Sequence, residues 1–196
     1  MKRQIRNFRD LFFFLIKTKG STNEQDNHFK KRARILGIQK KYNFSSFIET
    51  GTFFGQMSVF AAKHFEIVHT IESYLPIYSY NHKMIQIKNI KKYHGKSVDH
   101  LESILEEEED NCLFWLDGHW SGPGTGGKNE PCPVLEEINI IQKKKLSRFC
   151  ILIDDARCFN GESNYPKLEL VIKTLNQIGK ISYIEKDSDC VIALKV

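Results

Sequence analysis

The stretch Phe47–Gly55, with the sequence FIETGTFFG, decides the fold, and Glu72 follows it at the end of the next apolar run. An apolar run, a glycine-containing turn and a return to apolar residues are typical of a strand, a turn and a helix. Gly51 permits the positive φ that a tight turn requires and lets the backbone approach a ligand. A helix beginning near Gly55 would direct its free N–H groups at that ligand. A carboxylate about 20 residues later, ending a second strand, can accept hydrogen bonds from ribose hydroxyls.

The turn favours one nucleoside-containing cofactor over another. Thr52 and Phe53 stand where a dinucleotide-binding turn would carry its second glycine, which lets the backbone approach a pyrophosphate. S-adenosylmethionine has no pyrophosphate, so the turn favours it over NAD. An ordinary strand, turn and helix with an exposed Glu72 is the alternative, because short motifs also occur without function.

Apolar segments on both sides of this stretch predict alternating strands and helices. The strands are expected at 47–48 and onward, 67–71, 87–93, 112–116, 149–153, 181–184 and 190–194. The helices are expected at 29–42, 57–64, 78–85, 98–105, 134–141 and 168–178. The pattern predicts an α/β fold, a Rossmann-like doubly wound sheet of seven mostly parallel strands. The short connection 186–189 makes the last strand antiparallel.

Composition limits the classes of protein to consider. The chain of 196 residues is 41% hydrophobic, which suits one domain with a real core. The net charge of +5 is concentrated in the first 45 residues and at Lys143–Lys145, and a solvated basic face explains it better than an anionic partner. The five cysteines include no C-x-x-C pair, which favours free thiols in a reducing compartment and a cytoplasmic location. The acidic run Glu106–Asp110 is expected to be a solvated helix end.

We divide the chain into an N-terminal helical extension and linker, residues 1–43, and a main domain, residues 44–196. The apolar run Leu11–Ile16 is too short to span a bilayer, so we expect no transmembrane segment. We expect the polar run Lys19–Asn27 to be the linker. The first 27 residues could form a lid over the cofactor or a subunit interface, so a homo-oligomer remains open.

An acid follows each strand that would line the ligand site. These acids are Glu49, Glu72, Asp117 and the pair Asp154–Asp155. Ligands of open α/β sheets bind at the carboxyl ends of the strands, where these side chains would meet. Three converging carboxylates need a cation or a proton, and oxygen ligands suit Mg²⁺. The alternative is that these aspartates cap turns and that Arg157 neutralises them.

His119 follows Asp117 by two residues, on the loop that leaves the fourth apolar strand. Its ordinary pKa near neutrality suits a general base, although a structural role is the alternative.

The stretch Gly122–Lys128 matches the spacing of a phosphate-binding loop, G-x-x-x-x-G-K. Asn129 replaces the serine or threonine that would bind Mg²⁺, and Pro131 and Pro133 oppose a helix directly after the loop. We therefore interpret it as a lid or substrate loop. A surface loop without function is the alternative.

With these motifs assembled, residues 44–196 resemble class I S-adenosylmethionine-dependent methyltransferases. The segment Glu49–Gly55 is similar to the first motif of that family, and Glu72 to its ribose-binding acid. The Asp117-Gly118-His119 stretch and the Asp154–Asp155 pair resemble the metal-dependent macrocin type of sugar O-methyltransferase. The sequence departs from that type at His119, where the family carries an acidic base, and at Ala156, where an aromatic residue is usual.

The resemblance implies an S-adenosylmethionine-dependent O-methyltransferase acting on a sugar, a glycan precursor or another small hydroxylated molecule. It implies Mg²⁺ on Asp117, Asp154 and Asp155, with His119 at the position of the catalytic base. The residues assigned to the cofactor are Glu49, Thr50, Gly51, Thr52, Gly55, Glu72, Ser73, Ser97 and Asp117. Two rival classes remain open: a cofactor-binding protein without catalysis, and a nucleotide-using kinase or dehydrogenase. We expect no nucleic acid partner.

Overall fold

A computed structural model describes residues 22–108, 110–120, 122–127, 131–178 and 189–196. The strands are β1 (Ser46–Thr50), β2 (Ile67–Glu72), β3 (Ile90–His94), β4 (Cys112–Leu116), β5 (Phe149–Ile153) and β6 (Val191–Lys195). The helices are α2 (Thr22–Tyr42), α3 (Gln56–Ala61), α4 (Leu75–Met84), α5 (Ser97–Glu107), α6 (Val134–Lys144), α7 (Leu168–Gln177) and the 3₁₀ turn η1 (Ala156–Cys158).

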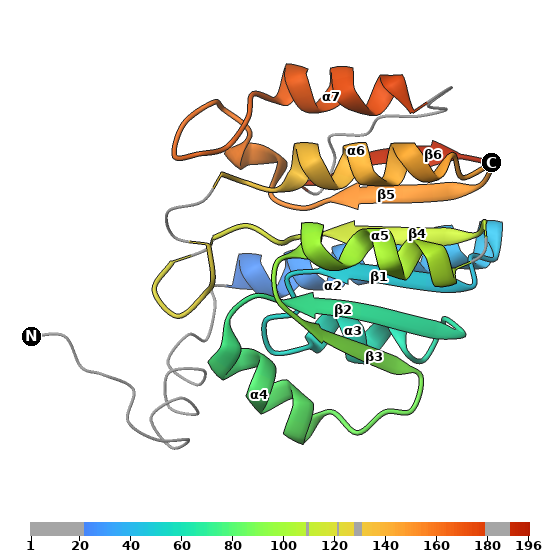
Figure 1. The fold of residues 1–196 in the computed structure, drawn as a ribbon, viewed down its shortest axis with the longest axis vertical. Coiled ribbons are helices and arrows are strands. Elements are labelled where there is room, and N and C mark those ends of the chain that lie inside the picture. Colours follow the sequence, from blue (N-terminus) through green and yellow to red (C-terminus); the bar gives the residue numbers. More distant parts are fainter. Residues whose placement is uncertain (1–21, 109, 121, 128–130, 179–188) are drawn as a thin grey trace, which may run out of the picture.

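The strands form one sheet in the order β3-β2-β1-β4-β5-β6, in which only β6 is antiparallel to its neighbour. Helices cover both faces, with α5, α6 and α7 on one side (Figure 1). The predicted α/β Rossmann-like architecture and its antiparallel last strand are confirmed. Six strands are described, and the predicted strand at 181–184 lies outside the described residues.

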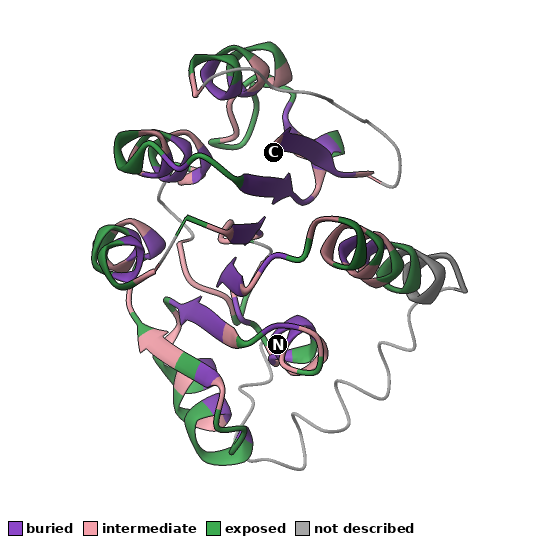
Figure 2. Ribbon diagram, turned by 90° about the vertical axis from the view of Figure 1, so that its right-hand side faces the viewer, coloured by how far each residue is buried: buried purple, intermediate pink, exposed green. Residues whose placement is uncertain are grey.

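The central strands are apolar throughout because both of their faces are covered. Every residue of β1, β4 and β5 is buried, as Figure 2 shows by colour. One core cluster joins the sheet to α5, α6 and α7, and the other joins it to α2 and α3. Ile35 of α2 is fully buried in the second cluster, so this helix packs on the same core as the strands.

One expectation about a polar segment was wrong. Residues 22–27, predicted as part of a linker, belong to α2, because Glu24 and Gln25 are good helix formers that continue the helix. The acidic run is a solvated helix end at Glu106 and Glu107, as expected, because both are exposed where α5 ends, whereas Glu108 is half-buried. Glu108 contacts Nε2 of the fully buried His69 at 2.8 Å and accepts a hydrogen bond from Ser46. A buried histidine needs such a polar partner.

Among the described residues, no helix has the length and apolar content needed to cross a membrane.

Candidate active site

The register of the sheet places four chain positions in one row at the carboxyl edge. Thr50 pairs with Ile71 and with Leu116, and Leu116 pairs with Ile153. The next positions along these strands are Gly51, Glu72, Asp117 and Asp154. Of the acids predicted to meet at this edge, Glu72, Asp117 and Asp154 therefore follow neighbouring strands there, and the loops that follow the strands gather at the same edge (Figure 1).

The turn after β1 has the conformation that its glycines predict. Gly51 has φ of +82°, and a Cβ at this position would collide with the backbone carbonyl of Asp117. Gly55 has φ of +71° and precedes α3. Two features therefore require glycine at position 51: the left-handed backbone conformation and the close approach of the turn after β1 to the loop after β4.

Glu72 lies beneath the turn and holds it. Its Oε2 accepts the N–H of Phe53 at 2.9 Å, and its Oε1 accepts the N–H of Tyr74 at 2.8 Å. The residue is 7% exposed, and burial raises the pKa of its carboxyl. Each carboxylate oxygen can accept two hydrogen bonds, so capacity remains for ribose hydroxyls.

Glu49 points into the interior rather than to the opening of the site. It is 1% exposed and accepts hydrogen bonds from the hydroxyls of Thr70, at 2.6 Å, and Ser58. Thr52 extends the network, because its Oγ1 lies 2.6 Å from the Thr70 Oγ1. Burial raises the pKa of Glu49 to about 7, against the lowering effect of these hydroxyls. Glu49 can thus support the cofactor turn from below.

A third buried carboxylate, Glu137 of α6, was not predicted from the sequence. It is 1% exposed, and hydrogen bonds from Ser97 and Thr50 join it to two positions assigned to the cofactor. Its Oε1 has no hydrogen-bond partner, and burial raises its pKa to about 7. Glu137 precedes Ile138, within the apolar stripe of α6, and that spacing is the signal that could have revealed it.

The carboxylates after β4 and β5 are matched by basic side chains. His119 lies between two of them, with Nε2 at 3.0 Å from Asp155 Oδ2 and Nδ1 at 3.6 Å from Asp117 Oδ1. Lys31 of α2 reaches Asp154, with Nζ at 2.5 Å from Oδ1. Arg157 contacts Asp155 at 2.8 Å, as the alternative interpretation of this acid predicted. Lys31 was also missed, and nothing in the local sequence distinguishes it from the other basic residues of α2.

These partners set the charge of each acid. Burial and the charges of Asp154 and Asp155 raise the pKa of Asp117 well above its usual value. Burial alone would raise the pKa of Asp155, but the hydrogen bond and charge of His119, with the charge of Arg157, lower it to about 2. The cluster therefore keeps Asp155 ionised and leaves Asp117 in need of a cation or a proton.

Whether these residues can hold a metal ion depends on the type of their donor atoms and on the distances between them. Asp117, His119 and Asp155 each offer one ligand atom, and these three atoms lie within 4.8 Å of one another. Two carboxylates and an imidazole are an acceptable donor set for a divalent ion. Asp154, the third ligand implied by the resemblance, does not belong to this group.

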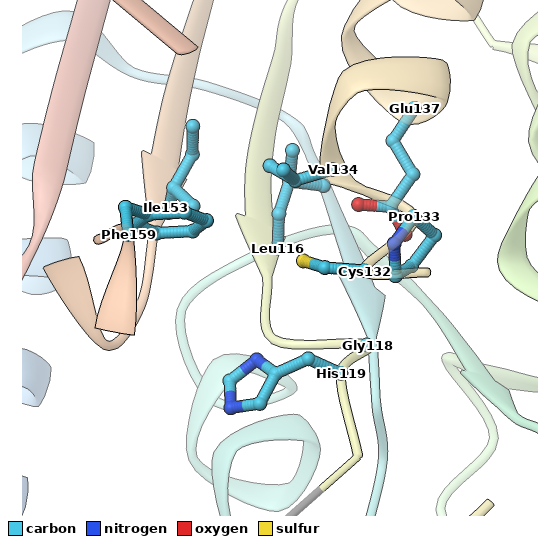
Figure 3. A pocket seen from close by; sticks show the side chains of 9 residues that line it. All are labelled: Leu116, Gly118, His119, Cys132, Pro133, Val134, Glu137, Ile153 and Phe159. Atoms are coloured by element: carbon cyan, nitrogen blue, oxygen red, sulfur yellow. The ribbon is translucent and has the colours of Figure 1, made fainter. Parts of the chain in front are cut away.

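A small pocket opens beside His119. Figure 3 shows its lining, which includes Glu137 and the loop residues Gly118 and Cys132. Its apolar wall consists of residues that end β4 and β5 or begin α6, together with Phe159. The pocket places the unpartnered oxygen of Glu137 and the ring of His119 in one concave region.

The glycine loop does not have the geometry of a phosphate-binding loop. Its described part, residues 122–127, forms a turn in which Thr125 donates to the carbonyl of Gly122, and the next helix among the described residues begins at Val134. Gly126 lies so close to Ser73 that a Cβ there would collide with its hydroxyl. The loop thus lies next to the residue that follows Glu72, where a loop over the cofactor would lie.

The comparisons with known proteins agree on the fold. No protein-family model matches the chain, and no curated protein sequence matches it. Among solved structures, the O-methyltransferase TomG of Streptomyces achromogenes, in complex with SAM, is similar with a TM-score of 0.62 and 12% identity, over 100% of each chain. An O-methyltransferase of Bacillus cereus, in complex with SAH, has a TM-score of 0.62 and 15% identity, over 85% of this chain and 81% of that one.

A third similar structure carries a different chemistry. Precorrin-6y C5,15-methyltransferase of Geobacter metallireducens has a TM-score of 0.54 and 14% identity, over 84% of this chain and 88% of that one. The protein therefore has the fold of class I S-adenosylmethionine-dependent methyltransferases, and the resemblance seen in the sequence is confirmed at the level of the fold.

Proposed function

We propose that this protein is an S-adenosylmethionine-dependent methyltransferase that methylates a hydroxyl oxygen of a sugar or another small hydroxylated molecule. The observation that carries the proposal is the row of residues at the sheet edge, with a buried ribose-type acid at one end and a carboxylate cluster at the other. The SAM and SAH bound to two proteins of the same fold support the choice of cofactor.

The cofactor half of the site is assigned to the turn after β1 and to Glu72. In this proposal Glu72 accepts hydrogen bonds from the ribose hydroxyls, and the turn at Gly51 lies against the methionine part. Ser73 and Ser97 border the nucleoside, and Gly126 brings the glycine loop over it. Glu49, Thr50, Thr52 and Gly55 support this surface, since Glu49 and Thr50 are buried below it.

The acceptor half is assigned to Asp117, His119 and the Asp154–Asp155 pair. The acceptor oxygen attacks the methyl carbon, the carbon–sulfur bond breaks, and S-adenosylhomocysteine leaves with the bonding electrons. The proton of the acceptor hydroxyl passes to one base of the cluster, which is the imidazole of His119 when no ion occupies it. Holding the oxygen in line with the methyl group supplies much of the rate enhancement, because positioning alone is worth several kcal/mol.

A divalent ion such as Mg²⁺ fits the donor atoms at this end of the site. When bound, it would be held by Asp117 and Asp155 and would make an acceptor hydroxyl more acidic. The choice of a sugar or polyol rests on the same carboxylates, because a vicinal diol can chelate such an ion. We place the protein in the cytoplasm, with a small-molecule acceptor as its partner.

The rival functions have less support. A kinase would need a glycine loop that opens into a helix, and here six residues separate Gly127 from α6. A dehydrogenase would need a close approach to a pyrophosphate at Thr52–Phe53. A cofactor-binding protein without catalysis remains the second candidate, because the close pairing of Lys31 with Asp154 is also compatible with a purely structural cluster.

The decisive experiment is transfer of a tritiated methyl group from S-adenosylmethionine to a panel of sugars, nucleotide sugars and polyols. The proposal predicts label in at least one hydroxylated acceptor, and its loss in Asp117→Asn. The exposed Asp99→Asn is the matched control. Binding of the cofactor without transfer to any member of the panel would favour the inactive protein, and protection against heat by ATP or NAD alone would favour a nucleotide-using enzyme.

A further inference from the structure

We propose that Lys31 is a built-in counter-cation that withdraws Asp154 from metal binding, so that Asp117, His119 and Asp155 hold a single divalent transition-metal ion such as Mn²⁺. The inference rests on the proposed function, in which the cluster assists methyl transfer. It differs from the ligand set implied by the resemblance, which consists of three aspartates.

The first step is the burial of the Lys31–Asp154 pair. The two side chains are 6% and 8% exposed, and Nζ lies 2.5 Å from Oδ1. The same oxygen accepts the N–H of Asp155 at 2.8 Å and lies 3.7 Å from the sulfur of Cys190. An ammonium in such a desolvated contact is costly to remove, because it would leave an unpaired buried charge. Asp154 is thus already neutralised by a cation of the protein.

The second step is the arrangement of the remaining three groups. His119 directs one ring nitrogen at each of two carboxylates, Asp155 at 3.0 Å and Asp117 at 3.6 Å. The side chain of Asp117 is 32% exposed and that of Asp155 is 19% exposed, whereas Lys31 reaches Asp155 only at 3.9 Å. One ligand atom from each of the three residues lies within 4.8 Å of the other two, and the two carboxylates are partly open to solvent.

The donor set also indicates which ion binds. Mg²⁺ prefers an all-oxygen set, whereas an imidazole nitrogen beside carboxylates suits Fe²⁺ and Zn²⁺, and Mn²⁺ accepts carboxylate-rich sets of this kind. The replacement of an aspartate ligand by His119 thus shifts the expected preference from Mg²⁺ toward a transition metal.

The test is titration of the full-length protein with Mn²⁺, followed by electron paramagnetic resonance, with pulsed spectra to detect nitrogen coupled to the bound ion. We expect one bound Mn²⁺ with imidazole nitrogen coupling, which changes when histidine is labelled with ¹⁵N. His119→Gln should remove the coupling and weaken binding at least tenfold, whereas the exposed His82→Gln should change neither. Asp154→Asn should change the affinity by less than threefold, and Lys31→Met should not weaken it.

The outcomes separate this inference from the proposed function. Mn²⁺ bound without nitrogen coupling, an Asp154→Asn effect as large as that of Asp117→Asn, or no Mn²⁺ binding by the folded protein would overturn the inference. Binding of S-adenosylhomocysteine, measured by calorimetry with EDTA present, tests the cofactor site alone. If Lys31→Met does not fold, Asp154→Asn still tests the inference, because it removes the carboxylate charge that Lys31 neutralises.

Discussion

The two halves of the site are built on different principles. In the cofactor half, Glu72 and Glu49 are held by backbone N–H groups and hydroxyls of nearby strands and turns. In the acceptor half, Asp154 and Asp155 are held by charged groups, and one of them, Lys31, comes from a helix far earlier in the chain. In the proposed function, the first half is a hydrogen-bonded scaffold for the ribose of the cofactor, and the second is a balance of charges that a cation or a substrate would change.

The largest expected effect concerns the charge balance. Lys31→Met leaves Asp154 buried without its partner and should lower the free energy of unfolding by about 3 to 5 kcal/mol. Denaturation in urea measures it. The double variant Lys31→Met/Asp154→Asn should be more stable than Lys31→Met alone. If the two variants are equally stable, the pair contributes through packing rather than charge.

The next effect is the pH dependence of stability, which should differ between Glu137, whose partners are hydroxyls, and Asp155, whose partners are charged. Burial raises the pKa of Glu137 to about 7 from a value of 4.5, so the folded state binds its proton more tightly than the unfolded state. Stability should therefore be full below about pH 4.5 and decrease as the pH rises through 7, by up to about 3 kcal/mol. Asp155, whose pKa is lowered, contributes in the opposite direction, with stability lost on acidification toward about pH 2.

Unfolding at pH 5 and pH 8 measures this contribution. Glu137→Gln should reduce the loss of stability between the two values, and the exposed Glu136→Gln should not. An unchanged pH dependence in Glu137→Gln would mean that this carboxyl titrates as an ordinary glutamate.

Gly51 joins the two halves and gives a third test. Gly51→Ala places a Cβ against the carbonyl of Asp117 at a φ of +82°, and should destabilise the protein by about 2 to 3 kcal/mol. Gly37→Ala, in α2 with nothing within 4 Å of the added Cβ, should stabilise it by about 0.5 to 1 kcal/mol. Chemical denaturation of both variants checks the contrast, and similar values for the two would contradict the close approach of Gly51 to the loop after β4.

The smallest effect is a selective one on ligand binding. Glu72→Ala should weaken binding of S-adenosylhomocysteine at least tenfold, which corresponds to about 1.4 kcal/mol. Asp155→Asn should change this affinity by less than threefold, because Asp155 belongs to the other half. The exposed Glu66→Ala is the control for Glu72→Ala. Equal losses in Glu72→Ala and Asp155→Asn would mean that the two halves do not act separately.

The contrast between the halves also explains what could be predicted from the sequence. The turn at Gly51 and the acid at Glu72 depend on residues close together in the chain, so their spacing predicts the geometry. The strands β4 and β5 were predicted with their observed bounds, because fully apolar runs between polar turns have one interpretation. The row at the sheet edge follows from parallel register once the strands are known.

The charge partners could not be predicted in the same way. Lys31 is one of many basic residues in the first 45, and only the packing of α2 on the sheet selects it. The position of Glu137 in the apolar stripe of α6 predicts its burial, but its neighbours Thr50 and Ser97 could not be predicted, because they come from separate elements. Contacts that depend on how helices pack across a sheet are not encoded by local spacing.

The measurement that tests the central claim most directly is calorimetric titration of the purified protein with S-adenosylhomocysteine, with and without divalent ion, using ATP and NAD as controls. We predict one site of micromolar affinity for S-adenosylhomocysteine in the presence of EDTA, and no comparable binding of ATP or NAD. Absence of binding by the folded protein, with and without metal, would contradict the assignment of the sheet edge as a methyl-donor site.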